Sequence, residues 1–160
     1  MKKKNSILYI IFGIIVIISA ILFLKNNKST IKKELRDFAY EDTASVNKIF
    51  LADKNNNTIL LERINGNTWR VNNKFIARND AIRNLLDIIA SVQVKSPVPK
   101  SAFENVTKFL ATRSVKVEIY ANNDKVKTYY VGPATPDNLG TYMILENSSV
   151  PFITHKPGFN

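Results

Sequence analysis

Near its N-terminus the chain carries eighteen consecutive uncharged residues, Ile7 to Leu24, and this segment most constrains what the chain can fold into. As a helix rising 1.5 Å per residue, it would cover about 27 Å, close to the hydrocarbon thickness of a bilayer. A cleaved signal peptide has a shorter apolar core that is followed by small residues at the cleavage site. Here Ser19 and Ala20 lie inside the apolar segment, and Lys25 follows it directly. The sequence therefore predicts an uncleaved, single-pass transmembrane helix.

The basic residues gather around this segment. Residues 1–33 contain seven lysines and no acidic residue, whereas the other 16 basic residues are offset by all 13 acidic residues, which leaves residues 34–160 with a net charge of +3. Lysines beside an apolar segment favour anionic lipid head groups. The formal net charge of +10 therefore indicates a membrane partner and no nucleic acid. Because Lys2 to Lys4 form the tighter cluster, we expect a cytoplasmic N-terminus and a domain exported across the inner (cytoplasmic) membrane.

The length of the chain allows one domain besides this anchor. We assign residues 1–24 to a cytoplasmic tail and transmembrane anchor, residues 25–45 to a linker with a possible short helix, and residues 46–160 to an exported domain. The absence of cysteine excludes disulfides and thiolate chemistry.

Seven apolar-rich runs, separated by Asn, Asp, Gly and Pro, are typical of strands. The runs are 46–52, 58–64, 68–71, 115–121, 125–131, 141–146 and 152–155. Between the third and fourth runs the period changes, since apolar residues recur at three and four positions in 78–92 and again in 102–112, which predicts two helices. Prolines in Ser96–Pro99 separate these helices by an extended break. The predicted fold class is α+β: an N-terminal transmembrane helix followed by a mostly antiparallel sheet in the order β-β-β-α-α-β-β-β-β, with both helices on one face.

Five separated segments also resemble a known family. They are Asp42–Asp53, Val94–Lys100, Val115–Tyr120, Thr128–Gly132 and Asp137–Met143. In order and spacing they resemble the membrane-anchored Bacteroidetes proteins of the family called domain of unknown function 4340. The resemblance implies an exported α+β domain, an association of some relatives with transport systems of the ATP-binding-cassette (ABC) type, and no catalytic residues to carry over. Similar chains run on through further strands and helices, so the resemblance also implies a domain that continues past Asn160.

Few side chains in the sequence suggest chemistry. His155 is the only histidine, and a lone imidazole needs an orienting partner or further ligands to act as a base or to hold a metal ion. We interpret it as a surface or structural residue. The run from Asp53 to Asn57 lacks the central glycine and terminal glutamate of a calcium loop, and we interpret it as a turn. With no glycine-rich phosphate loop or serine elbow, we expect no catalytic residue, no metal ligand and no cofactor.

The segment Gly132 to Gly140 is the one that we expect to contact a partner. It is longer than a hairpin requires, two prolines stiffen it, and loops held on a sheet commonly build binding sites. The alternative is that it only connects two layers of sheet. The candidate partner-binding residues are Pro133, Thr135, Pro136, Asp137 and Asn138.

Together these features predict a membrane-tethered, non-enzymatic binding or accessory module of the cell envelope. Its partner would be a protein, such as an ABC transporter, or an envelope polymer, and an exposed sheet edge offers one route of binding. Two alternatives stay open. One is an enzyme whose site lies beyond Asn160, and the other is a structural transporter subunit whose anchor packs through Gly13 and Ser19-Ala20.

Overall fold

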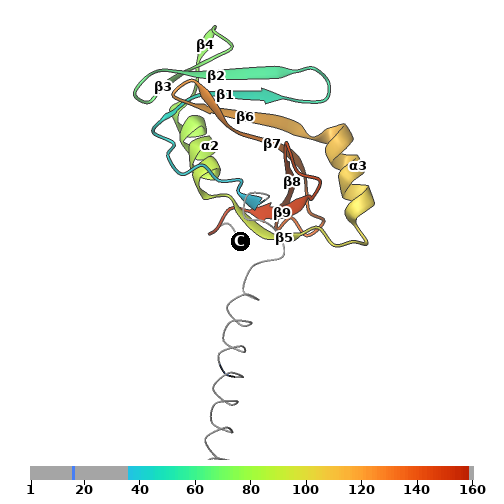
Figure 1. Cartoon of the computed structure of the whole chain (residues 1–160). Coiled ribbons are helices and arrows are strands. Elements are labelled where there is room, and N and C mark those ends of the chain that lie inside the picture. Colours follow the sequence, from blue (N-terminus) through green and yellow to red (C-terminus); the bar gives the residue numbers. More distant parts are fainter. Residues whose placement is uncertain (1–15, 17–35, 159–160) are drawn as a thin grey trace, which may run out of the picture. The chain divides into compact units, whose positions relative to one another are not determined.

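The computed structural model describes Val16 and residues 36–158 of the chain. Within residues 36–158 the chain forms a single curved sheet of nine strands and two helices (Figure 1). The strands are β1 (Val46–Ala52), β2 (Thr58–Asn65), β3 (Thr68–Val71), β4 (Phe75–Ile76), β5 (Gln93–Pro97), β6 (Val115–Ala121), β7 (Asp124–Ala134), β8 (Thr141–Leu145) and β9 (Phe152–His155), and the helices are α2 (Asn79–Ser91) and α3 (Phe103–Arg113).

All neighbouring strands are antiparallel, in the order β4-β3-β2-β1-β6-β7-β8-β9-β5. Asparagines make the turns because they tolerate the left-handed conformation. Asn56 turns β1 into β2, Asn72 and Asn73 turn β3 into β4, and Asn122 and Asn123 turn β6 into β7, all with positive φ. The two hairpins join where β1 pairs with β6, with Ile49 opposite Ile119.

The predicted fold class is wrong in its order of elements. The order is β-β-β-β-α-β-α-β-β-β-β, because the prediction missed β4 and β5. The strand β4 is only two residues long. The strand β5 overlaps the extended break predicted at Ser96–Pro99, and it pairs with β9 through Gln93, Val94, Ser96 and Pro97. The predicted transmembrane helix also finds no support: no helix in Val16 or residues 36–158 is long and apolar enough to cross a membrane, and Ile7 to Leu24, Val16 excepted, lie outside the described residues.

The two helices lie on opposite faces of the sheet, which corrects the expectation of a single helical face (Figure 1). Consecutive residues of a strand point to opposite faces. Val131 in β7 lines a cavity together with Leu85 and Ile89 of α2, whereas a β-carbon on the next residue, Gly132, would lie 2.7 Å from Leu110 of α3. The physical reason is β5: the chain runs along the sheet edge between the two helices and passes from one face to the other.

The main core lies on the face that α2 covers, which we call the α2 face. Ile49, Trp69, Ile119 and Phe152 are all at most 1% exposed there. Phe38 joins them from the residues that the sequence analysis assigned to the linker. Its ring meets those of Tyr129 and Phe152 edge to face, with centroids 6.1 and 6.0 Å away.

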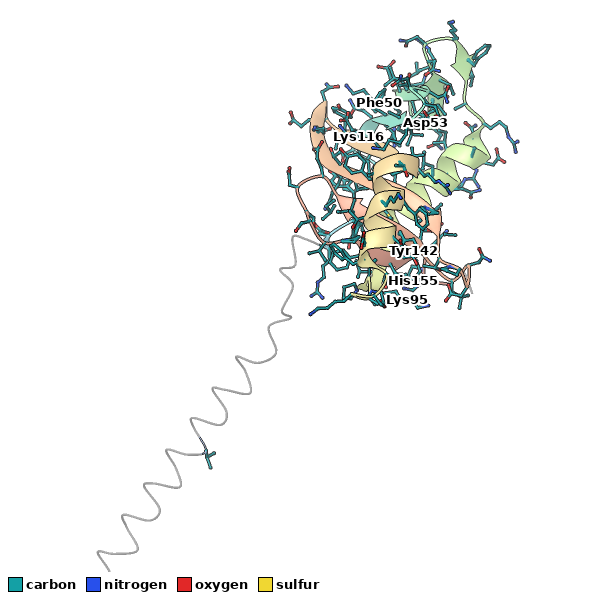
Figure 2. The ribbon with its side chains drawn as sticks, turned by 90° about the vertical axis from the view of Figure 1, so that its right-hand side faces the viewer. Phe50, Asp53, Lys95, Lys116, Tyr142 and His155 are labelled. Atoms are coloured by element: carbon teal, nitrogen blue, oxygen red, sulfur yellow. The ribbon has the colours of Figure 1, made fainter. Side chains whose placement is uncertain are left out.

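On the opposite face, which we call the α3 face, β6 carries a charged network at the end where Figure 2 shows Phe50 and Lys116. The Lys116 ammonium lies 2.7 Å from one carboxylate oxygen of Glu118, and the Tyr120 hydroxyl donates to the other at 2.8 Å. These two contacts lower the pKa of Glu118 below its ordinary 4.5, and the contact with Lys116 contributes more than the one with Tyr120. The charged form of Glu118 therefore stabilises the fold.

We expect Glu118→Gln to lower the free energy of unfolding near neutral pH by about 1 kcal/mol, because it removes a charge-assisted contact that is largely shielded from water. Since folding lowers the pKa of Glu118, this stabilisation is complete above 4.5 and is lost as the pH falls through the folded-state pKa. Urea unfolding at several pH values checks this: the difference between the two proteins should shrink in acid. The exposed Glu41 provides a control in Glu41→Gln, and a pH-independent loss in Glu118→Gln would contradict the assignment.

Candidate functional site

A groove of about 330 Å³ lies on the α3 face, between the predicted partner-binding loop and the connection from β5 to α3. We call it the loop groove. Its size is at the lower end of typical ligand sites. Figure 2 shows Lys95 and Tyr142 at this end of the domain, away from the Glu118 network. The lining residues are Lys95, Ser96, Pro99, Ala102, Thr135, Pro136, Asp137, Tyr142 and Ile153.

The floor of the loop groove is apolar and fixed by the sheet. Tyr142 of β8 is paired with Ile153 of β9, so both side chains point to the same face. Tyr142 also packs into a small core with Val106 and Leu110 of α3. The floor therefore stays in place without a ligand, which favours tight binding because little has to be ordered.

Hydrogen bonds inside the loop shape one wall of the groove. The backbone N–H of Thr135 donates to the carbonyl of Gly140 at 2.8 Å, and the N–H of Asn138 donates to the carbonyl of Thr135 at 2.8 Å. A β-carbon on Gly140 would lie 2.6 Å from the Ile153 side chain and 3.1 Å from the carbonyl of Thr154. Glycine at this position therefore lets the loop close against β9.

Asp137 and Lys95 place opposite charges on the rim of the groove. The Thr135 hydroxyl donates to the Asp137 carboxylate at 2.5 Å, and the N–H of Leu139 donates to the same oxygen at 3.1 Å. These bonds, with the charge of Lys95 as a smaller contribution, lower the pKa of Asp137. Asp137 is therefore ionised at neutral pH, and its carboxylate accepts hydrogen bonds from within the loop.

The structure places three of the five predicted site residues in the groove. Thr135, Pro136 and Asp137 line it. Pro133 belongs to β7, and Asn138 takes the left-handed conformation (φ 57°) at the turn, so neither lines the groove.

Sequence reasoning missed the other side of the groove. Lys95, Ser96, Pro99 and Ala102 are about 40 positions from the loop, and only the register of β5, β9 and β8 brings them near it. One signal was available: Ser96–Pro99, like the partner-binding loop, contains two prolines within four residues, and it was interpreted as a break.

The other residues that the sequence singled out lie elsewhere. Asp53 accepts hydrogen bonds from the backbone N–H groups of Asn55 and Asn57 at 2.8 and 2.9 Å, as a turn residue does. His155 sits at the end of β9, opposite Gln93. Within the described part of the chain, no three His, Cys, Asp or Glu side chains gather into a group that could hold a metal ion.

Comparisons of the chain with protein-family models, with curated proteins and with solved structures gave no match. The resemblance to the domain of unknown function 4340 family therefore stays a prediction.

Proposed function

We propose that this chain is a non-enzymatic binding module of the cell envelope, and that it holds an extended segment of a partner protein at the β5 edge and the loop groove. One observation carries the proposal: a preformed groove with an apolar floor lies directly beside a free edge of the sheet. Lys95 and Ser96 belong to both, since they lie in β5 and line the groove.

The edge supports pairing with only a short segment. The strand β5 is last in the sheet order, and within residues 36–158 no strand pairs with its outer side. Partner strands commonly add to such an edge through main-chain hydrogen bonds. Pro97 has no N–H to donate, so the pairing is limited to Gln93 to Ser96. Such a short pairing contributes little specificity alone, and the groove must supply it.

The groove suits one apolar side chain of the partner, with charged partner residues on either side of it. Tyr142 and Ile153 form a floor for one apolar side chain, and the two rim charges, Lys95 and Asp137, favour partner residues of opposite sign. Interfaces commonly combine a buried apolar centre with a polar rim in this way.

The location is part of the same proposal and rests on the sequence. The uncharged segment Ile7 to Leu24 and its flanking lysines favour the cytoplasmic membrane, with the domain exported. An ABC transporter remains one candidate for the partner because of the family resemblance.

Crosslinking at a single position in living cells tests the proposal. A photoreactive amino acid replaces Lys95 in the full chain, and in a matched control it replaces Lys74, an exposed lysine beside β4 at the opposite sheet edge. We expect a discrete crosslinked protein from position 95 and none from position 74. Mass spectrometry of the crosslinked product then identifies the partner, and recovery of a permease or ATPase would support the transporter association.

A second variant asks whether the groove itself is used. Ala102→Trp fills the groove from its α3 side and should lower the crosslinking yield from position 95 at least tenfold. Because Ala102 packs against the core beneath α3, the unfolding midpoint of the same variant is measured to separate a blocked groove from a loss of the fold. Equal crosslinking yields from positions 95 and 74, or an unchanged crosslinking yield in Ala102→Trp, would contradict the proposal.

A further inference from the structure

A cavity of about 310 Å³ lies on the α2 face, between the first two turns of α2 and the hairpin of β2 and β3. We call it the arginine cavity. Trp69, Ile82 and Leu86 form its apolar side, and the first two of these are almost fully buried. Its volume is at the lower end of the range for sites that bind small organic ligands.

The charge of the lining is one-sided. Its polar side chains are those of Arg63, Asn67, Asn79 and Arg83, and no carboxylate of the described residues is among them. Two acidic residues are adjacent to these in the sequence. Glu62 points to the opposite face from Arg63, because consecutive residues of a strand alternate, and Asp80 forms an ion pair with Arg78 outside the lining. The wall therefore has two positive charges and no negative charge.

Neither guanidinium has a counter-ion among residues 36–158. Arg63 donates to the backbone carbonyls of Thr43 and Ala44 at 2.8 and 3.1 Å, and both of these acceptors are neutral. The Nε atom of Arg63 is buried and has no hydrogen-bond partner. Arg83 is exposed and forms no ion pair with any described residue. A charge that is partly shielded from water without a counter-ion costs free energy, and an anion in the cavity would recover it.

We propose that the arginine cavity binds a phosphate monoester, the terminal phosphate of a small organic ligand. Such a group carries close to two negative charges near pH 7, which matches two guanidiniums, and arginine pairs with phosphate oxygens through two parallel hydrogen bonds. The amides of Asn67 and Asn79 have N–H groups to donate to the remaining oxygens. The apolar side of the cavity leaves room for the organic part of the ligand.

This site is separate from the proposed partner site. The arginine cavity lies on the α2 face, whereas the loop groove lies on the α3 face. Neither proposal depends on the other, and each can fail alone.

The fluorescence of Trp69 tests this proposal, because Trp69 is the only tryptophan of the chain and lines the cavity. The full chain, in a maltoside detergent that contains no phosphate, is titrated with phenyl phosphate at constant ionic strength. We expect a saturable change in emission, and Arg83→Gln should weaken binding by at least about tenfold because it removes one of the two charges. The matched control, Arg70→Gln, removes the same charge from the residue next to Trp69, which points to the α3 face, and should change the affinity by less than about twofold. No saturable change in the wild type, or equal weakening in the two variants, overturns the site.

A second pair of variants tests the missing negative charge. Asn67→Asp places a carboxylate in the wall and should weaken the binding of phenyl phosphate by at least about tenfold. Asn65→Asp makes the same change two positions away, at an exposed residue outside the lining, and should bind like the wild type. Because the new carboxylate in Asn67→Asp can pair with an arginine of the wall, its unfolding midpoint should be no lower than that of Asn65→Asp. Equal affinities in the two variants overturn the site, and a lower midpoint in Asn67→Asp overturns the uncompensated charge.

Three further ligands identify the chemistry. Acetate and dimethyl phosphate carry one negative charge each, and both should bind at least about tenfold more weakly than phenyl phosphate, because one guanidinium stays unpaired. Inorganic phosphate should also bind more weakly, because it has no organic part to contact the apolar side. Equal binding of acetate would indicate a carboxylate ligand, and equal binding of dimethyl phosphate would indicate the diester of a lipid head group or envelope polymer. Tighter binding of inorganic phosphate would indicate the free ion, and each of these three results overturns the monoester assignment.

Discussion

Trp69→Ala is expected to lower the free energy of unfolding by about 3–5 kcal/mol, the largest stability loss that we predict for a single side chain. Trp69 is 1% exposed, and it is the chain's only tryptophan. The Arg63 guanidinium lies 5.0 Å from its ring and donates to the carbonyls of Thr43 and Ala44. Alanine would therefore leave a cavity and also remove the surface that positions Arg63. A loss of this size approaches the whole stability of a typical domain.

Urea unfolding followed by circular dichroism measures this effect, since the variant has no tryptophan to report by fluorescence. Phe75→Ala is the matched control: it removes an aromatic side chain from the neighbouring β4, where Phe75 is 69% exposed. We expect the control to change the stability by less than about 0.5 kcal/mol. Similar losses in the two variants would contradict the core that we describe.

Gly132→Ala is expected to loosen α3 from the sheet, at a cost of about 1–3 kcal/mol. The added β-carbon would lie 2.7 Å from a methyl carbon of Leu110 and 3.2 Å from the carbonyl oxygen of Tyr142. The leucine methyl has to move, and Leu110 is only 5% exposed, so its neighbours have to move with it. Because Ala102 and Tyr142 line the loop groove, the same substitution should also weaken the proposed crosslink from position 95.

A double-mutant cycle separates this steric effect from a general loss of stability. Leu110→Ala alone should cost about 2–5 kcal/mol, because it leaves a cavity beneath α3. In the double variant the smaller side chain leaves room for the new methyl group, and the total loss should be smaller than the sum of the single losses by about 0.5–2 kcal/mol. If the two single losses simply add in the double variant, the Leu110 side chain is not the reason why position 132 needs a glycine.

Much of the fold was predictable because its strands and helices have clear periods. The strands 46–52, 68–71, 115–121 and 152–155 have the predicted bounds, and both helices differ from the prediction by one residue at each end. Alternation explains this success: in β6, Val117, Ile119 and Ala121 are buried, and the residues between them are not. Such a pattern is local and needs no knowledge of neighbours.

The missed strands had no such pattern. Phe75 and Ile76 are both exposed, so β4 shows no alternation, and its pairing with Arg70 and Val71 follows from the asparagine turn alone. The strand β5 includes Pro97, a residue that argues against a central strand and is compatible with an edge. The error over the helical faces has the same origin, since without β5 nothing indicated that the chain changes sides.

The candidate site was predictable only in part, for the same physical reason. The composition of the loop, with its prolines and turn residues, was visible in the sequence, and Thr135, Pro136 and Asp137 do line a groove. A groove also needs a second wall, and that wall comes from distant residues whose approach depends on strand order. A further cavity, of about 540 Å³ between α2 and strands β6 to β9, had no local signal at all, because its lining residues come from one helix and four strands.

The pairing of β5 with β9 has a consequence for the time course of folding. The two strands are separated by about 60 positions, and β9 comes after the other eight described strands in the sequence. Hairpins such as β1 with β2 close locally and form early, whereas contacts between distant positions close late. Both the loop groove and the cavity between α2 and strands β6 to β9 include residues of β9. During synthesis, neither the loop groove nor this cavity is therefore complete until β9 has left the ribosome.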